Sequence, residues 1–355
     1  MLTTSSGSLL FHGGMLVLTL TAAWAAGRDR RPRDWWLAAA AVGGLAVVLA
    51  YSLGDRGFGS LRLLAYGWFG YLAATLAAAA ISLARRHPRA ATVFAALFML
   101  VEAAAFDAFL VEPHWLEVRQ VRLVSPKIQQ PVTIAILADL QTDEIGPYEQ
   151  SVLERVMAAR PDLILLAGDY IQEFDNAGRR RLHRELRAML QEIGLSAPLG
   201  IYAVRGNVDS DGWRVSFEDT GVTCANSTQS FDLGEVRLTA LAIEDSFSTA
   251  LQISKSDQFQ IVFGHCPNFA RGDVKADLLV AGHTHGGQVR LPLIGPLITL
   301  SRVPRRWAAG VTDLGDGKTL IVSRGLGMER GPAPRLRFLC RPELVFVELV
   351  PENSR

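Results

Sequence analysis

Histidine, aspartate and asparagine recur in this sequence directly after short apolar runs. His283 and His285 follow the run Leu278–Ala281, and Asp169 follows Leu163–Ala167. Imidazole, carboxylate and amide oxygen together suit divalent ions such as Mn, Fe, Zn or Mg. The pattern therefore predicts a metal site, and its candidate ligands are Asp139, Gln141, Asp169, Asn207, His265, His283 and His285.

The chemistry expected of such a set is attack at phosphorus. Two divalent ions about 3.5–4 Å apart that share a carboxylate can stabilise both the attacking and the leaving oxygen of an in-line displacement. Asp169 is the natural bridge, because it follows a central strand. A single Gly-Asp is usually a turn, and a single histidine usually has no metal. Here five apolar runs in order each end in Asp, Asn or His, and the last is followed by Gly282-His283-Thr284-His285. Taken together, these five strand ends form a specific pattern.

The apolar runs that carry these residues read as β-strands. In open α/β sheets, ligands gather outside the carboxyl ends of the strands, and glycine lets the backbone turn sharply there. Stretches 150–159 and 177–193 have the pattern of helices, and Pro161 closes the first. The predicted strands are Leu116–Leu123, Val132–Ala138, Leu163–Ala167, Ile201–Arg205, Val236–Ile243, Gln260–Phe263, Leu278–Ala281, Thr319–Ser323 and Leu344–Leu349. Helical crossovers followed by a strand-rich half predict an α/β sandwich of two facing sheets.

Before about residue 111 the sequence consists mainly of long apolar runs. Four runs, each long enough to cross a bilayer, are Leu9–Ala26, Trp35–Leu53, Leu63–Ala84 and Ala90–Leu110. The first and third connecting loops are rich in arginine: Arg28, Arg30, Arg31 and Arg33, then Arg85, Arg86 and Arg89. The middle loop has only Arg56 and Arg62, beside Asp55. The positive-inside rule therefore predicts cytoplasmic first and third loops and an extracytoplasmic segment after the fourth span.

Composition excludes some partners. The formal net charge of +1 is far from the basic excess of a nucleic-acid-binding protein, so no nucleic acid is expected. The 3 cysteines, Cys224, Cys266 and Cys340, are widely spaced. They form no metal-binding pair and no disulfide framework.

Residues 132–350 resemble the calcineurin-like metallophosphoesterase superfamily, whose motifs run D-x-H, G-D, G-N-H-D/E, H and G-H-x-H. Their counterparts here begin at Asp139, Gly168, Gly206, His265 and Gly282. The end of the chain, with Ser323-Arg324-Gly325-Leu326-Gly327 and then Arg341-Pro342-Glu343, is similar to the membrane-tethered bacterial branch. Such spans also resemble those of transmembrane proteins with a metallophosphoesterase domain.

The resemblance implies a fold and a domain division. The expected architecture is a four-helix transmembrane region, residues 1–111, followed by a calcineurin-like four-layer α/β/β/α metallophosphoesterase sandwich, residues 112–355. The four spans and the arginine distribution predict an integral protein of the cell (inner) membrane with its catalytic domain on the extracytoplasmic side.

The same resemblance implies two ligand sets. One ion would be held by Asp139, Gln141, Asp169 and His285, and the other by Asp169, Asn207, His265 and His283. A hydroxide shared by the ions would be the nucleophile, so that Asp169, Asn207 and His265 act catalytically through it.

Two residues depart from the family pattern. Gln141 stands where the pattern has histidine, and an amide oxygen is a weaker donor than imidazole. Val208 stands where the pattern has the histidine of G-N-H-D, a group worth roughly 10²–10⁴-fold in rate when it acts on the leaving group or the phosphoryl oxygen. Some branches that resemble this chain have another residue in that position and remain phosphodiesterases.

Two basic segments have alternative interpretations. Arg305 and Arg306, in the loop after Gly-His-Thr-His, either bind a substrate phosphate or belong to an ordinary surface loop. The basic helix within 179–187 is a solvated face by default, and contact with anionic headgroups is the alternative.

The sequence thus predicts a metal-dependent hydrolase of a phosphodiester or pyrophosphate bond. Its substrate would be a phosphorylated small molecule or a lipid-linked envelope compound, and the membrane would be its other partner. The alternative is a metal-binding scaffold or sensor whose site has lost its acid and one imidazole. Retention of Asp169, Asn207 and the three histidines favours the enzyme.

Overall fold

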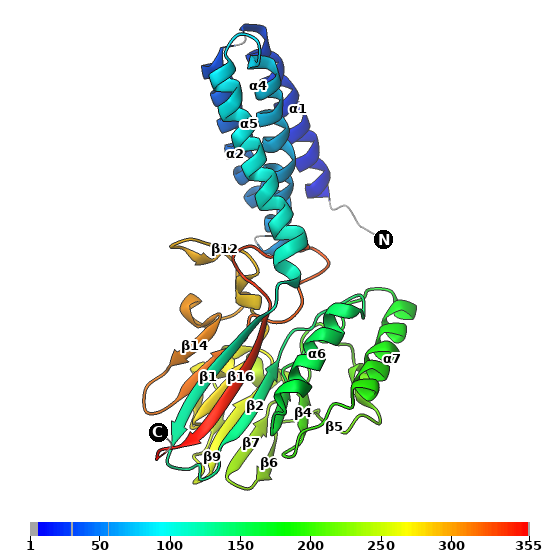
Figure 1. Ribbon diagram of the computed structural model, residues 1–355, viewed down its shortest axis with the longest axis vertical. Coiled ribbons are helices and arrows are strands. Elements are labelled where there is room, and N and C mark those ends of the chain that lie inside the picture. The colour runs from blue at the N-terminus through cyan, green and yellow to red at the C-terminus, as the bar shows by residue number, and fades with distance from the viewer. Residues whose placement is uncertain (1–5, 30, 56, 354–355) are drawn as a thin grey trace. The chain divides into compact units, whose positions relative to one another are not determined.

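The computed structural model describes residues 6–29, 31–55 and 57–353. The chain divides into two compact units (Figure 1). The first holds residues 1–111 and 330–335, and the second holds residues 112–329 and 336–355.

The first unit contains long apolar helices at each predicted span. They are Ser6–Asp29 (α1), Pro32–Leu53 (α2), Phe58–Leu83 and Pro88–His114, the last two each interrupted by a π-helical turn. Within the described residues, 4 helices are long and apolar enough to cross a membrane. Pro32 and Pro88 occupy first-turn positions, where the missing N–H costs nothing. Arg30 and Arg56, used above for orientation, lie outside the described residues.

Small side chains let these helices pack closely. Ala39 and Ala79 are buried in one cluster with Trp35 and Phe94. Many large apolar side chains point outward instead, among them Leu16, Leu37 and Ile81. Such packing is typical of helices surrounded by lipid, where small residues line the interfaces between helices.

The second unit is a sandwich of two six-stranded sheets. The first sheet has the order β1-β16-β2-β3-β4-β5, and the second has the order β14-β15-β11-β9-β7-β6. In the first sheet the strands are Glu117–Ser125 (β1), Glu343–Pro351 (β16), Val132–Leu137 (β2), Leu163–Leu166 (β3), Ile201–Val204 (β4) and Val222–Ala225 (β5). In the second they are Gly310–Asp313 (β14), Thr319–Val322 (β15), Leu278–Ala281 (β11), Phe259–Phe263 (β9), Val236–Ala240 (β7) and Gln229–Leu233 (β6).

Apolar layers hold the sandwich together. Inward-facing residues of both sheets, such as Ile134, Leu165, Ile261 and Val280, form one buried core. Helices Pro147–Ala159 (α6) and Asn176–Ile193 (α7) cover the outer face of the first sheet (Figure 1). Short helical segments, including Ile243–Phe247 (α8) and Pro267–Arg271 (η5), lie at the second sheet. The predicted α/β sandwich after four apolar helices is confirmed.

Parallel pairing brings the important strand ends together. β2, β3 and β4 pair in parallel, as do β7, β9 and β11. Their carboxyl ends therefore lie at one edge of each sheet, which is where the sequence places its Asp, Asn and His residues.

One strand ends earlier than its sequence predicts, and several strands have no counterpart among those predicted. The predicted strand Val236–Ile243 stops at Ala240, and Ile243 begins α8. Strands β5, β6 and β14 were not predicted, nor were the two-residue strands Gln252–Ile253 (β8), Asp273–Val274 (β10), Arg290–Leu291 (β12) and Gly295–Pro296 (β13). Most of these are short or half-exposed edge segments, whose apolar pattern is weak.

Candidate metal centre

The turns after β2, β3, β9 and β11 bring carboxylates and imidazoles into one buried cluster. Asp139, Asp169, His265 and His285 are each at most 1% exposed. Nε2 of His265 lies 3.3 Å from Oδ2 of Asp169, and Nδ1 of the same ring lies 3.7 Å from Oδ1 of Asp139. Nδ1 of His283 lies 3.2 Å from Nε2 of His265. Residues far apart in sequence thus face one another across the gap between the two sheets.

Asp169 is common to two groups of potential ligands. It lies with His265 and His283 in one group, and with Asp139 and His285 in the other. Within each group the ligand atoms lie within 4.8 Å of one another. A carboxylate shared in this way is what a pair of closely spaced divalent ions requires.

The backbone at these residues is unusual. φ is 50° at Asp139, 37° at Gln141, 56° at Asp169, 69° at His283 and 47° at His285. Non-glycine residues seldom adopt positive φ, and such strained residues cluster at functional sites, where the surrounding structure compensates their cost. Four of these five residues, Asp139, Asp169, His283 and His285, belong to the two groups of potential ligands.

Two glycines make room for Asp169. A Cβ on Gly206 would lie 2.0 Å from Oδ1 of Asp169, so no larger residue fits without moving that carboxylate. Gly168 has φ of 88°, and a Cβ there would lie 2.9 Å from Nδ1 of His265. The glycines of the Gly-Asp and Gly-Asn sequences are therefore needed for close approach.

Backbone carbonyls fix the orientation of two histidines. Nδ1 of His265 lies 2.9 Å from the carbonyl oxygen of Ala167, and Nε2 of His283 lies 3.1 Å from that of Leu300. When each of these nitrogens donates its proton to the carbonyl, the other nitrogen is left to accept a metal. Those two nitrogens are the ones that face each other at 3.2 Å, and the amide oxygen of Asn207 lies 2.9 Å from Nε2 of His265.

His285 provides the clearest sign that a cation fits this cluster. Both of its ring nitrogens are buried, and neither has a hydrogen-bond partner among the described residues. Burying a polar nitrogen without a partner is costly. A divalent cation between His285, Asp139 and Asp169 would satisfy one nitrogen, and borderline ions bind this donor set well.

The electrostatics of the cluster agree with that fit. Burial and the neighbouring Asp169 raise the pKa of Asp139, although His265 opposes the shift. Burial disfavours the charged form of His265, but Asp169 and Asp139 overcome it and raise the pKa of His265 to about 9. Burial and His265 lower the pKa of His283 to about 4. Two buried carboxylates repel each other here, and cations would relieve that repulsion.

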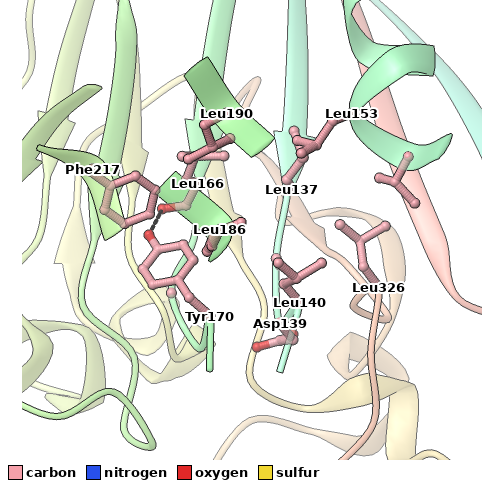
Figure 2. A pocket seen from close by; sticks show the side chains of 13 residues that line it. Leu137, Asp139, Leu140, Leu153, Leu166, Tyr170, Leu186, Leu190, Phe217 and Leu326 are labelled. Carbon is pink, nitrogen blue, oxygen red and sulfur yellow. Dashed lines mark hydrogen bonds between the residues drawn. The ribbon is translucent and has the colours of Figure 1, made fainter. Parts of the chain in front are cut away.

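An apolar wall lies behind Asp139 and accounts for its loss of solvation. Leu137, Leu140, Leu166 and Leu326 line a narrow cavity beside it (Figure 2). Tyr170 closes one side, its hydroxyl donating to the carbonyl oxygen of Leu166 at 2.9 Å. Water is thereby kept from that side of the carboxylate.

Asp209 has a positioning role that the sequence did not reveal. Its carboxylate accepts from the backbone N–H groups of Asp169, Tyr170 and Gly206, each at 2.8 Å. It thus ties the turn after β3 to the turn after β4, and the N–H of Val208 donates to Oδ1 of Asp169 at 2.9 Å. Burial and Asp169 raise the pKa of Asp209 to about 6.

Gln141 is held by two residues that sequence reasoning also missed. Its amide nitrogen donates to Oε1 of Gln172 and to Oε2 of Glu329, both at 3.0 Å. Gln172 in turn donates to Oε1 of Glu329 at 2.8 Å. Because a carboxylate can only accept, Glu329 sets the amide so that nitrogen faces it. Nothing in the local sequence around Glu329 points to this contact.

The remaining predicted residues are less buried than the two carboxylates of the cluster. Val208 is half-buried beside Asn207, which is exposed. Arg305 and Arg306 are exposed and line a cavity with the β12–β13 segment. That loop is joined to the histidine turn, because the hydroxyl of Thr284 donates to the carbonyl oxygen of Ala308 at 2.6 Å.

Comparison with known proteins supports the same chemistry. Residues 132–287 match the family model for calcineurin-like phosphoesterases. The chain is 28% identical over 263 residues to metallophosphoesterase YkuE of Bacillus subtilis, covering 68% of this chain and 88% of that protein. It is 29% identical over 256 residues to phosphodiesterase YaeI of Escherichia coli, covering 67% of this chain and 90% of that protein.

A third relative is a metallophosphoesterase of Aquifex aeolicus, 26% identical over 276 residues, covering 71% of this chain and 98% of that protein. The matched family segment runs from β2 to the Gly-His-Thr-His turn and so contains every candidate ligand. Residues 132–287 are therefore similar to calcineurin-like phosphoesterases, and the chain is a hydrolase that acts on phosphoric ester bonds.

Proposed function

We propose that this chain hydrolyses a phosphodiester or pyrophosphate bond in an amphiphilic, lipid-linked compound of the cell envelope, using two divalent ions. The observation that carries the proposal is the position of Asp169, common to two groups of potential ligands. The relative named as a phosphodiesterase, at 29% identity, supports a diester.

The two proposed ligand sets extend the two groups around Asp169 by Gln141 and Asn207. Asp139, Gln141, Asp169 and His285 would hold one ion. Asp169, Asn207, His265 and His283 would hold the other. Two bound ions supply Lewis-acid stabilisation of phosphoryl oxygens and lower the pKa of water. Mn, Fe, Zn or Mg are the ions that this donor set suits.

The protein's own groups would orient the substrate. Arg305 and Arg306 are exposed in the loop whose Ala308 carbonyl accepts from Thr284 of the histidine turn, and guanidinium groups bind phosphate with two parallel hydrogen bonds. No imidazole stands at Val208 to donate a proton to the leaving oxygen. A substrate whose leaving group is stable as an anion suits such a site best, which favours diesters and pyrophosphates over alkyl monoesters.

The first test concerns metal content. The purified full-length protein in detergent should bind close to two Mn ions, and Asp169→Ala should abolish both, because its carboxylate would touch each ion. Asp211→Ala, with a side chain 97% exposed, is the matched control and should keep both. Elemental analysis that finds one ion or none in reconstituted wild type would rule out the two-metal site.

The second test concerns the unusual amide ligand. Gln141→His should tighten Mn binding at the weaker site, on the order of tenfold, because imidazole is the better donor and Glu329 can accept from its second nitrogen. Calorimetric titration of Mn measures this, and Gln150→His on the exposed face of α6 is the control. Unchanged affinity at both sites would exclude position 141 from the ligands.

The third test concerns substrate type. With Mn, wild type should hydrolyse an activated aryl phosphodiester faster than the matching monoester. Val208→His should raise monoester turnover more than diester turnover, by up to roughly 10²-fold, because it adds a proton donor near the leaving oxygen. Val215→His, at an exposed valine, should change neither. Equal rates on both esters, unaffected by Val208→His, would refute the claim that position 208 sets the preference for diesters. Absence of hydrolysis with any metal would favour the alternative of a metal-binding scaffold.

The fourth test concerns orientation. The arginine-rich first and third loops favour a cytoplasmic position for both, which leaves the catalytic unit outside the cytoplasm. A reporter enzyme active only after export should be active when fused after Arg355 and inactive when fused at Pro88. The reverse pattern would place the catalytic unit in the cytoplasm.

A further inference from the structure

The β12–β13 hairpin has an apolar tip. Arg290–Leu291 pairs antiparallel with Gly295–Pro296, and the residues between them include Leu293 and Ile294. Leu293 is fully exposed, at 109% of its reference area, and Ile294 is 59% exposed. Hairpin tips in water usually carry Gly, Asn or Asp, so two large aliphatic side chains at this place require an explanation.

Arginines surround the base of this tip. Arg290, Arg305 and Arg306 line an open cavity of about 640 Å³ together with the hairpin and Leu339, which is 53% exposed. No acidic side chain lines the cavity. Within the described residues, no carboxylate forms an ion pair with Arg305 or Arg306. The surface therefore combines exposed apolar groups with unneutralised positive charge.

Hydrogen bonds connect this surface to the metal centre. Leu300, which follows the hairpin, accepts from Nε2 of His283 at 3.1 Å through its carbonyl oxygen. Arg290 donates from Nη1 to the carbonyl oxygen of Gly286 at 3.3 Å. A molecule bound at the hairpin would thus lie next to the turn that carries His283 and His285.

Protein surfaces that lie in a membrane interface typically combine aliphatic side chains with neighbouring arginines. The apolar groups enter the boundary of the acyl chains, and the arginines bind lipid phosphates. A free phosphate would use the arginines but would leave Leu293 and Ile294 in water. Four helices that are long and apolar enough to cross a bilayer directly precede the catalytic unit, so the chain tethers this unit to any bilayer that they span. Residues 112–116, which join residue 111 to β1, can extend only on the order of 20 Å.

We propose that the hairpin 290–296 and Arg305 and Arg306 form a phospholipid-docking surface. Leu293 and Ile294 enter the interface of the bilayer, while the arginines bind the phosphates of its anionic lipids. Substrate headgroups drawn from the same leaflet then reach the histidine turn without leaving the membrane surface. This inference rests on the membrane anchoring proposed above and does not depend on the chemistry at the metal centre.

The test uses the full-length protein in nanodiscs of phosphatidylglycerol whose acyl chains carry bromine, a contact quencher of fluorescence. An environment-sensitive fluorophore is attached at Leu293→Cys in a Cys224→Ser background, because Cys266 and Cys340 are buried. The matched control carries it at Phe174→Cys, another apolar residue, 69% exposed in the same unit. The fluorophore at 293 should lose most of its emission, relative to unbrominated lipid, and the one at 174 should not.

A second variant tests the arginines. Adding Arg305→Gln and Arg306→Gln should reduce the quenching at 293, and wild-type arginines should give weaker quenching in brominated phosphatidylcholine than in phosphatidylglycerol. Absence of quenching at 293 would overturn the proposal and leave free phosphate or a protein as the occupant. Quenching that is unaffected by lipid charge and by the double substitution would overturn the role of the arginines.

Failure here is distinguishable from failure of the proposed hydrolysis. If the wild-type protein in nanodiscs hydrolyses a soluble aryl diester but shows no quenching at 293, the docking surface is refuted and the proposed hydrolysis stands. If quenching occurs at 293 but no metal supports hydrolysis, the docking surface stands and the proposed hydrolysis is refuted.

Discussion

Mutual repulsion between two buried carboxylates is the constraint on which the catalytic unit depends. Asp139 and Asp169 have no access to water, and an apolar wall stands behind Asp139. Like charges in such a place are unstable unless positive charge or hydrogen bonds compensate them. The compensation comes from His265 between them, from the N–H of His283 to Asp139 and from the N–H of Val208 to Asp169. The same arrangement is a strong site for cations.

The sandwich of two sheets holds Asp139 and Asp169 in place. Parallel strands from both sheets end at the same edge, and the turns after β2, β3 and β11 have positive φ at Asp139, Asp169, His283 and His285. Asp209 ties two of these turns together through three backbone N–H groups. The strain stored at the turns is tolerable because the two sheets and α6 and α7 are well packed behind them.

Much of this could be predicted from the sequence. The apolar spans, the main strands and the clustered candidate ligands are visible because long apolar runs and Gly-Asp or Gly-His turns are local signals. Edge strands such as β6 are not, because half-exposed segments lack a clear period. The end of β7 at Ala240 is hidden because Leu241 beyond it is also apolar and buried, so the apolar run continues past the strand. Glu329 and Gln172 were missed for another reason: they meet Gln141 only through the tertiary fold, 188 and 31 residues away along the chain.

The most direct test of the two-metal account is the anomalous X-ray scattering of crystals of the Mn-loaded full-length protein. The account predicts two anomalous peaks about 3.5–4 Å apart at the ends of the central strands, with the Asp169 carboxylate touching both. A single peak, or two peaks with Asp169 bound to only one of them, would contradict it.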